Sequence, residues 1–268
     1  MLNLFESINS VLEKRYAVNP DPWGLEPKRV IADLKFIWPF YHYYFDVHLH
    51  GKEQVKADIP YMVISNHTGQ IPIDGMLICT AFATELENPR ILRPLVERFL
   101  TSLPFLGRWS SEGGAVLGDR NNCLNLLKRG ESVLIFPEGV KGIAKNTKDF
   151  YKLQRFTRGF LRLALASGAE ILPIAVVGAE EFFPYVMQLK KIAKFLKIPA
   201  LPLSANLFPL PSPVDIYIGE PYSLPKELSA EALDEELDPH LILLEKKIHE
   251  LTEYGLKNKR TILQRLKP

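Results

Sequence analysis

Three apolar runs constrain the fold of this chain more than any other feature of its sequence. They cover residues 62–64, 133–136 and 171–178. The two longer runs are apolar at almost every position, as in strands that are buried on both faces of a parallel sheet. Helical segments separate the runs, and strands that alternate with helices at this spacing predict an α/β fold. A later run, residues 214–219, alternates between apolar and polar. We therefore expect a mixed, largely parallel sheet flanked by helices.

The first 45 residues predict an N-terminal pair of amphipathic helices. Apolar side chains recur at every fourth residue from Leu4 to Tyr16, and a second helix follows over residues 27–45, where Pro39 is expected to kink it. Its aromatic run favours a membrane–water interface, because Tyr and Trp join an apolar ring to a polar tip. Packing on the main domain is the alternative. We divide the chain into residues 1–45, which contact the membrane, and residues 46–268, which include a closing helix that begins at Pro239.

A second candidate for membrane contact is the segment 182–197, which joins aromatic residues to a basic amphipathic stretch. This pattern favours attraction to an anionic membrane surface, and a solvated helix face is the alternative. No apolar run approaches the ~20 residues that span a bilayer, and the N-terminus lacks the basic start and apolar core of a secretory signal. We therefore expect a cytoplasmic protein that associates peripherally with the cytoplasmic face of a membrane.

The composition argues against two classes of function. The chain has 268 residues and a net charge of +2, so its overall charge does not predict binding to nucleic acid. Cys79 and Cys123 fall in no metal-spaced motif and fit a reduced compartment. His48 and His50 share one face of a predicted strand, but a third metal ligand is not evident. We expect no metal site and no nucleic-acid partner.

Residues 62–74 carry the candidate catalytic chemistry. A strand leads into Asn66-His67, and Asp74 follows at a plausible helix start. A histidine that a strand delivers to a polar loop is well placed to act as a general base, with Asp74 holding the other nitrogen of its imidazole. The alternative is that His67 is an ordinary loop residue and Asp74 a helix N-cap.

Further blocks follow in order along the chain. They are Pro104-Phe105-Leu106-Gly107, Gly114-Ala115-Val116 up to Asp119-Arg120, Phe136-Pro137-Glu138-Gly139 and Ile171-Leu172-Pro173. Together with His67 and Asp74, they resemble the glycerolipid acyltransferase family of the lysophosphatidic acid acyltransferase type, over residues 45–222. Two departures stand out. The family pattern places four residues between His and Asp, where this chain has six, and Thr-Arg after Glu-Gly, where this chain has Val140-Lys141. Lysine keeps the charge of arginine but not its bidentate fork.

The resemblance implies a reaction. It is the transfer of a fatty acyl group, in phospholipid biosynthesis, from acyl-CoA or acyl carrier protein to the hydroxyl of a membrane glycerolipid, without a cofactor. A lysophospholipid is the favoured acceptor, and a neutral acceptor such as diacylglycerol or a long-chain alcohol remains open. The chain has no Gly-x-Ser-x-Gly nucleophile elbow, which favours direct attack by the acceptor. A hydrolase that uses water and a non-catalytic lipid-binding module are the rival functions.

The same resemblance implies roles for individual residues in the acyltransferase domain, residues 46–268. His67 is the general base, and Asp74 fixes its tautomer and stabilises the imidazolium. Arg120 and Lys141 hold phosphate, on the acceptor or on the thioester carrier. Glu138-Gly139 lies at the end of a buried strand and binds the acceptor.

Overall fold

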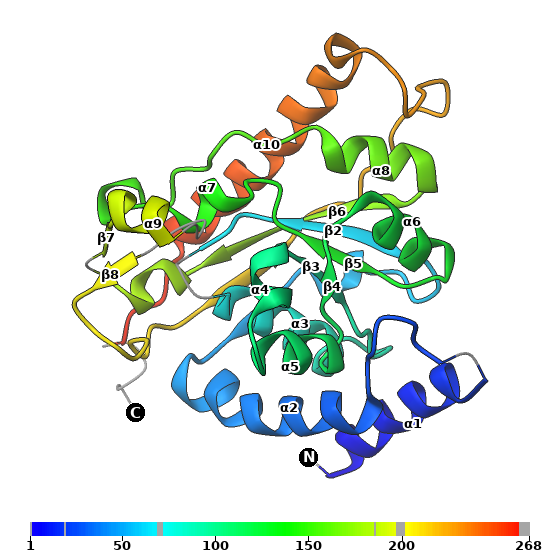
Figure 1. Cartoon of the computed structure of the whole chain (residues 1–268), viewed down its shortest axis with the longest axis horizontal. Helices are drawn as coiled ribbons and strands as arrows, with labels where there is room; N and C mark the ends of the chain where they lie inside the picture. Colours follow the sequence, from blue (N-terminus) through cyan, green and yellow to red (C-terminus); the bar gives the residue numbers. More distant parts are fainter. Residues whose placement is uncertain (1, 19, 69–71, 185, 197–201, 263–268) are drawn as a thin grey trace.

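A seven-stranded sheet organises the molecule (Figure 1). The computed structural model describes residues 2–18, 20–68, 72–184, 186–196 and 202–262. From edge to edge the strands are β1 (His48–His50), β9 (Asp215–Ile218), β6 (Glu170–Val177), β2 (Tyr61–Ser65), β5 (Val133–Ile135), β3 (Arg93–Val96) and β4 (Val116–Leu117). Strands β6, β2, β5, β3 and β4 run parallel to one another. Strand β9 is antiparallel to β6 and parallel to β1. The predicted mixed, largely parallel sheet is confirmed.

Helices cover both faces of this sheet (Figure 1). On one face lies α3 (Ile73–Thr84), against which α1 (Leu2–Val18) and α2 (Pro27–Pro39) pack. On the other face lie α6 (Arg120–Lys128), α8 (Gly159–Ser167) and α10 (Asp234–Lys257). The shorter elements are η1 (Phe40–Tyr44), η2 (Lys52–Gln54), α4 (Arg98–Ser102), α5 (Leu106–Glu112), α7 (Val140–Ile143), η3 (Thr147–Asp149), η4 (Ala179–Phe182), β7 (Val186–Gln188), α9 (Lys190–Leu196) and β8 (Pro202–Ser204). Within the described ranges, no helix combines the length and the apolar character needed to cross a bilayer.

One helix boundary differs from the sequence-based expectation, and it lies near a proline. The closing helix begins at Asp234, five residues before Pro239, because the Glu236 carboxylate accepts the backbone N–H of Leu233 at 2.8 Å and the first turn is acidic. The second helix continues past Pro39 as expected, but as the π-helical turn η1, in which the Phe45 N–H donates to the Phe40 carbonyl. Strand β3 was not predicted at all, since its four residues include a charged and a proline side chain.

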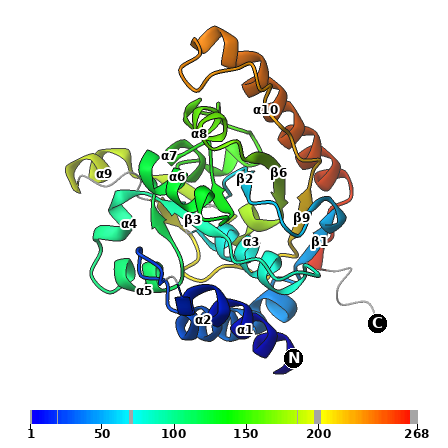
Figure 2. The same ribbon diagram turned by 90° about the vertical axis from the view of Figure 1, so that its right-hand side faces the viewer.

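The N-terminal helices are joined to the sheet by buried polar contacts as well as by apolar packing. Figure 2 shows α1 and α2 side by side next to α3. The fully buried guanidinium of Arg93, at the start of β3, lies 2.7 Å from Asp21 in the α1–α2 connection and 2.6 Å from Glu131. Tyr16 of α1 donates to the same Glu131 carboxylate at 3.0 Å. Buried hydrogen bonds therefore cross the boundary that the sequence placed after residue 45.

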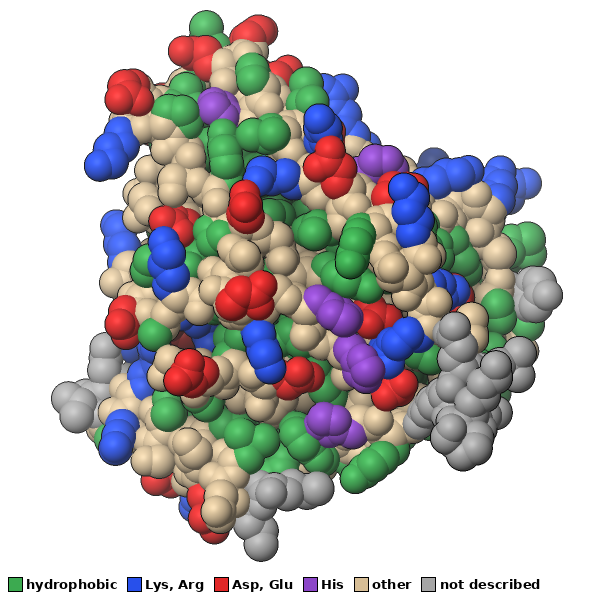
Figure 3. Space-filling model, turned by 180° about the vertical axis from the view of Figure 1, so that it is seen from behind, with side chains coloured by type: hydrophobic (Ala, Val, Ile, Leu, Met, Phe, Trp, Pro, Cys, Tyr) green, Lys and Arg blue, Asp and Glu red, His purple; other side chains and the backbone are tan. Residues whose placement is uncertain are grey.

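The histidine strand at the sheet edge forms side-chain pairs rather than a cluster of ligands. Histidine side chains gather on the face shown in Figure 3, beside acidic and basic groups. His50 lies 2.7 Å from Asp215 and stacks on Tyr217. Arg260 contacts both Asp215 and Asp46. Within the part of the chain that the structure describes, no group of three or more His, Cys, Asp or Glu side chains is arranged to hold a metal ion.

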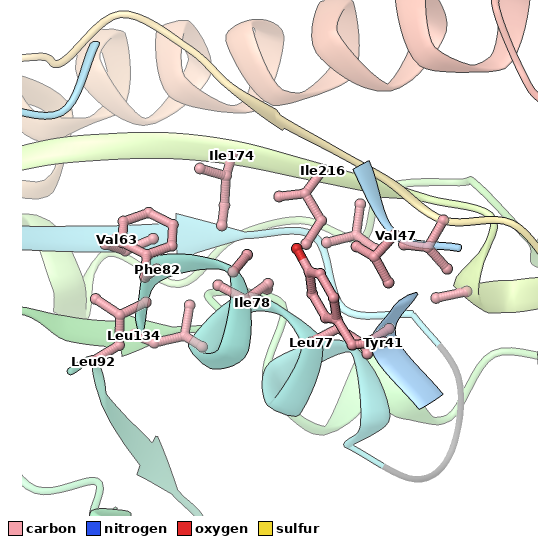
Figure 4. Close-up of a cluster of buried hydrophobic side chains, with 14 of the residues drawn as sticks. Tyr41, Val47, Val63, Leu77, Ile78, Phe82, Leu92, Leu134, Ile174 and Ile216 are labelled. Atoms are coloured by element: carbon pink, nitrogen blue, oxygen red, sulfur yellow. The ribbon is translucent and has the colours of Figure 1, made fainter. Parts of the chain in front are cut away.

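Strand β2 separates the two cores and fixes where the chain leaves the sheet. Its successive side chains point to opposite faces, and all five residues are buried. Val63 packs with Ile78 and Phe82 of α3, as Figure 4 shows, whereas Met62 and Ile64 join the core formed with α6, α8 and α10. The chain then emerges at the carboxyl end of β2, which is the edge where α/β sheets place their ligands.

Candidate active site

His67 and Asp74 form a close pair at the carboxyl end of β2. The Nδ1 atom of His67 lies 2.7 Å from an Asp74 carboxylate oxygen, although six residues separate the two in the sequence. Asp74 is fully buried, and the His67 side chain is 12% exposed. A carboxylate accepts the Nδ1 proton, so Nε2 is left unprotonated and can accept a proton from a substrate. The predicted pair is therefore assembled despite its longer spacing.

Backbone contacts hold Asp74 in place. Its Oδ2 atom accepts the Thr68 N–H at 2.8 Å, and its Oδ1 atom accepts the Gly75 N–H at 2.8 Å. Asp74 lies in the first turn of α3, whose N-cap is Pro72, so the carboxylate also faces the positive end of a helix. Asp74 is therefore not the N-cap of α3, and its Oδ2 atom faces both the His67 imidazole and the Thr68 N–H.

The imidazole of His67 lies on an apolar platform. Its ring stacks on Phe136, with centroids 4.0 Å apart and planes 18° from parallel. Behind it, α7 approaches so closely that a Cβ atom on Gly142 would lie 2.6 Å from the Cβ of His67 and 3.1 Å from that of Glu138. Only glycine fits at this position without movement of the backbone. The ring is therefore confined on two sides.

Asn66, the residue before His67, joins β2 to β6. Its side-chain oxygen accepts the Val176 N–H at 2.8 Å, and its side-chain nitrogen donates to the Val176 carbonyl at 3.0 Å. These two bonds continue the ladder beyond the last residue of β2. The strand is thereby extended up to the candidate base, which explains why an amide side chain precedes the histidine.

Glu138 is buried beneath the pair instead of facing solvent. Its Oε1 atom accepts the backbone N–H of His67 at 2.8 Å, and its Oε2 atom accepts the N–H of Gln154 at 2.8 Å. Gly139, which the sequence grouped with it, adopts φ 56° and ψ −146°, a conformation almost restricted to glycine, and begins the turn into α7. Glu138 therefore contacts the His67 loop.

Two further charged residues, which the sequence analysis missed, lie at this site. Lys145 and Glu180 are buried, and the Lys145 ammonium lies 3.2 Å from a Glu180 oxygen and 3.3 Å from a Glu138 oxygen. Burial raises the pKa of Glu180 to about 7, although the charge of Lys145 and a hydrogen bond from the Tyr151 N–H oppose that rise. No local motif marks either residue. The only signal in the sequence was that each follows the end of a predicted strand.

Arg120 and Lys141, the predicted phosphate ligands, are both exposed. Lys141 lies in α7, directly after the Glu138-Gly139 turn. Arg120 begins α6 after strand β4, which lies three strands away from β2 in the sheet order. At ~4.8 Å between strands, this is roughly 14 Å across the sheet. The two cations thus lie at different distances from the His67–Asp74 pair.

Comparison with known proteins relates these residues to a family. A family model described as Acyltransferase matches residues 46–177, a range that contains His67, Asp74 and Glu138. Over residues 46–177 the chain is therefore similar to the acyltransferase family, and the comparisons support its glycerolipid type. The crystal structure of the 1-acyl-sn-glycerophosphate (LPA) acyltransferase PlsC from Thermotoga maritima has the same fold. Its TM-score is 0.55 at 19% identity, covering 83% of this chain and 79% of that one.

Two curated relatives extend the comparison. An uncharacterized protein of Mycobacterium leprae is 34% identical over 211 residues, which are 75% of this chain and 58% of the relative. The human "DGAT1/2-independent enzyme synthesizing storage lipids" is 23% identical over 187 residues, which are 70% of this chain and 57% of the relative. The chain thus spans less than two thirds of the length of these relatives.

Proposed function

We propose that the protein transfers a fatty acyl group from acyl-CoA or acyl carrier protein to the hydroxyl of a glycerolipid, with a lysophospholipid as the favoured acceptor. The observation that carries this proposal is the 2.7 Å contact between His67 Nδ1 and buried Asp74, at the ligand-binding edge of the sheet, in a chain that is similar to the acyltransferase family. The pair supplies a general base that works near neutral pH.

The reaction proceeds by direct attack. Nε2 of His67 removes the proton from the acceptor hydroxyl while its oxygen attacks the thioester carbonyl carbon, giving a tetrahedral oxyanion. This intermediate collapses, the carbon–sulfur bond breaks, and the imidazolium returns the proton to the departing thiolate. Asp74 stabilises the imidazolium during these steps, as the carboxylate does in a triad. The products are the acylated lipid and the free thiol of the carrier.

Lys141 and Arg120 bind phosphate groups of the two substrates. Lys141 is the nearer in sequence and structure to the Glu138 turn, which suits a phosphate on the acceptor. Arg120, at the edge of the sheet, suits a phosphate farther from the reacting carbonyl, as on an extended thioester carrier. A neutral acceptor such as diacylglycerol is the second candidate. It is favoured by the name of the human relative, which refers to storage lipids, and by the lysine at position 141.

Exposed aromatic side chains near the N-terminus support peripheral attachment to the cytoplasmic face of a membrane. Phe36 and Tyr43 are 69% and 68% exposed, while Ile37 and Tyr41 of the same stretch are buried. One face of this stretch therefore packs on the protein and the other is free to enter a lipid surface. In the second predicted segment, Phe182 and Phe183 are core residues, and Met187 and Ile192 are exposed among the side chains that the structure describes there. Tyr185 lies outside the described residues.

The test is transfer of a radiolabelled acyl group from acyl-CoA to lysophospholipids, diacylglycerol, a long-chain alcohol or water, with acyl carrier protein as a second donor. His67→Ala is compared with His249→Ala, which removes an exposed histidine of α10. We expect wild type and His249→Ala to form one acylated lipid and His67→Ala to form none. Release of free fatty acid alone would identify a hydrolase. Absence of any product with either donor, with vesicle binding retained, would leave a lipid-binding module.

A further inference from the structure

We infer that Lys145 is a positioning residue that holds the His67 loop by tying together the ends of three adjacent strands. The inference rests on the proposed acyl transfer and concerns how its general base is fixed. Lys145 lies in the segment between α7 and η3, and its side chain is 4% exposed. Nothing in the reaction requires it to contact either substrate.

The Lys145 ammonium contacts three oxygen atoms. Nζ donates to the His67 carbonyl at 3.1 Å and lies 3.3 Å from Glu138 Oε2 and 3.2 Å from Glu180 Oε1. His67 follows β2, Glu138 follows β5 and Glu180 follows β6, and β2 lies between the other two strands. One buried cation thus contacts the carboxyl ends of three neighbouring strands, through two hydrogen bonds and one ion pair.

Glu138 and Lys145 bind the two backbone polar groups of His67. Glu138 accepts the N–H of His67, and Lys145 donates to its carbonyl, while the two side chains form an ion pair with each other. The backbone of the base is therefore enclosed in a ring of three polar contacts. Together with Asp74 on the imidazole, this ring fixes both the backbone and the side chain of His67.

Glu180 completes this arrangement from β6. One of its oxygens pairs with Lys145, and the other accepts the backbone N–H of Tyr151, a residue held at φ 59°. A non-glycine residue in this conformation is strained and persists only where its surroundings fix it. These contacts hold the loop that carries Lys145 against the end of β6. The position of the ammonium relative to His67 is therefore fixed.

The cluster also has a distinct charge. Around His67 lie the carboxylates of Asp74, Glu138 and Glu180, with Lys145 as the buried cation among them. Tyr151 and Glu181 lie next to Glu180, and Lys259 contacts Glu181. Removal of Lys145 leaves these carboxyl groups without the cation that joins them to the His67 loop.

The test compares Lys145→Met with Lys152→Met, which removes a 66% exposed lysine of the same loop. Because a displacement of about 1 Å at a reacting group can cost on the order of 100-fold in rate, we expect Lys145→Met to lower kcat about 100-fold while KM for the acceptor changes little. Lys152→Met should match wild type. A retained kcat in Lys145→Met, or a raised KM at unchanged kcat, would overturn the inference, since the second result identifies a substrate ligand.

A second variant guards against misfolding. Above the pKa of Glu180, about 7, Lys145→Met combined with Glu180→Gln removes one positive and one negative charge, so the net charge of the cluster is kept. We expect its kcat to stay low while the pH of half-maximal kcat stays near that of wild type, because position and not charge has been lost. Recovery of kcat in this double variant would contradict a positioning role. If wild type itself transfers no acyl group, the proposed function fails, which is distinct from failure of the Lys145 inference.

Discussion

Two buried ionic clusters occupy opposite ends of the parallel strands of the sheet. At the amino ends of β3 and β5, Arg93 is surrounded by Asp21, Glu131 and the hydroxyl of Tyr16. At the carboxyl ends of β2, β5 and β6, Lys145 contacts Glu138, Glu180 and the carbonyl of His67. In each cluster, one cation joins segments that are far apart in the sequence. The two clusters are therefore built in a similar way.

The two clusters differ in whether the protonation state of their ionisable groups is fixed. Although burial alone would lower the pKa of Arg93, a hydrogen bond to Asp21 and the charge of Glu131 raise that pKa, and burial raises the pKa of Tyr16 to about 12. Arg129, 3.7 Å from Glu131, adds a second cation. In the other cluster, the pKa of Glu180 is about 7, and the second cation is an imidazole that is charged only after it has taken a proton. One cluster is suited to stability and the other to proton transfer.

The largest expected effect follows from Asp74→Asn. An amide nitrogen facing Nδ1 would favour the tautomer with the proton on Nε2, which cannot act as a base. We expect kcat for acyl transfer to fall about 10³- to 10⁴-fold. Steady-state kinetics with the acceptor found for wild type would measure this. An Asp74→Asn variant that keeps more than a tenth of the activity would remove Asp74 from the mechanism and weaken the contrast between the clusters.

Arg93→Met should affect stability rather than chemistry. It leaves two buried carboxylates without their cation, which costs about 3–5 kcal/mol in the free energy of unfolding. Urea unfolding would measure the loss, and kcat of the folded fraction should be unchanged because His67 lies at the other end of the strands. Arg129→Met, at a side chain that is 25% exposed, is the matched control and should cost less. An inactive but stable Arg93→Met protein would contradict the division of roles.

Gly142→Ala probes the packing behind the candidate base. The added Cβ would lie 2.6 Å from His67 Cβ, so the loop must move, at a cost of about 1–3 kcal/mol in stability and with a lower kcat. Gly159→Ala is the control, because a Cβ there meets nothing within 4 Å and lies in the first turn of α8. Thermal unfolding and kcat would be measured for both variants. Equal behaviour of the two would show that the close approach of α7 is unimportant.

Glu180→Gln should change the pH dependence of stability. A free carboxyl ionises near pH 4.5, whereas the buried one keeps its proton to about pH 7, so unfolding releases a proton between these values. The stability of wild type is therefore full below pH 4.5 and falls as the pH rises toward 7, by up to about 3 kcal/mol for this group. Glutamine cannot ionise, so the variant should lose that slope in urea titrations at pH 5 and pH 8. An unchanged slope would show that Glu180 is ionised throughout.

The part of this molecule that follows from local patterns was predictable. Continuous apolar runs at 133–136 and 171–178 correspond to β5 and β6, and the alternating run at 214–219 contains β9. The His67–Asp74 pair was also reached, because both residues lie near one strand end and within one loop of the chain. Short-range spacing was sufficient for these features since strand burial and loop position depend mainly on neighbouring residues.

The clusters themselves were not predictable, for a physical reason. Lys145 lies 78 residues from His67 in the sequence, and only the order β6-β2-β5 brings them together. Arg93 was missed because a charged residue in a short strand gives no apolar pattern, and its partners are 72 and 38 residues away. The contact of Glu138 with the His67 loop depends on the same topology and was not predicted. Its position at the end of a strand was predicted, because it follows an apolar run.

The contacts of Arg93 also limit how such a protein can diverge by recombination. A foreign N-terminal helical pair grafted onto this sheet would have to supply a carboxylate where Asp21 lies and a hydroxyl where Tyr16 lies, or leave a buried guanidinium without them. Exchange of this segment between relatives is therefore expected to succeed only when the two carry the same polar residues.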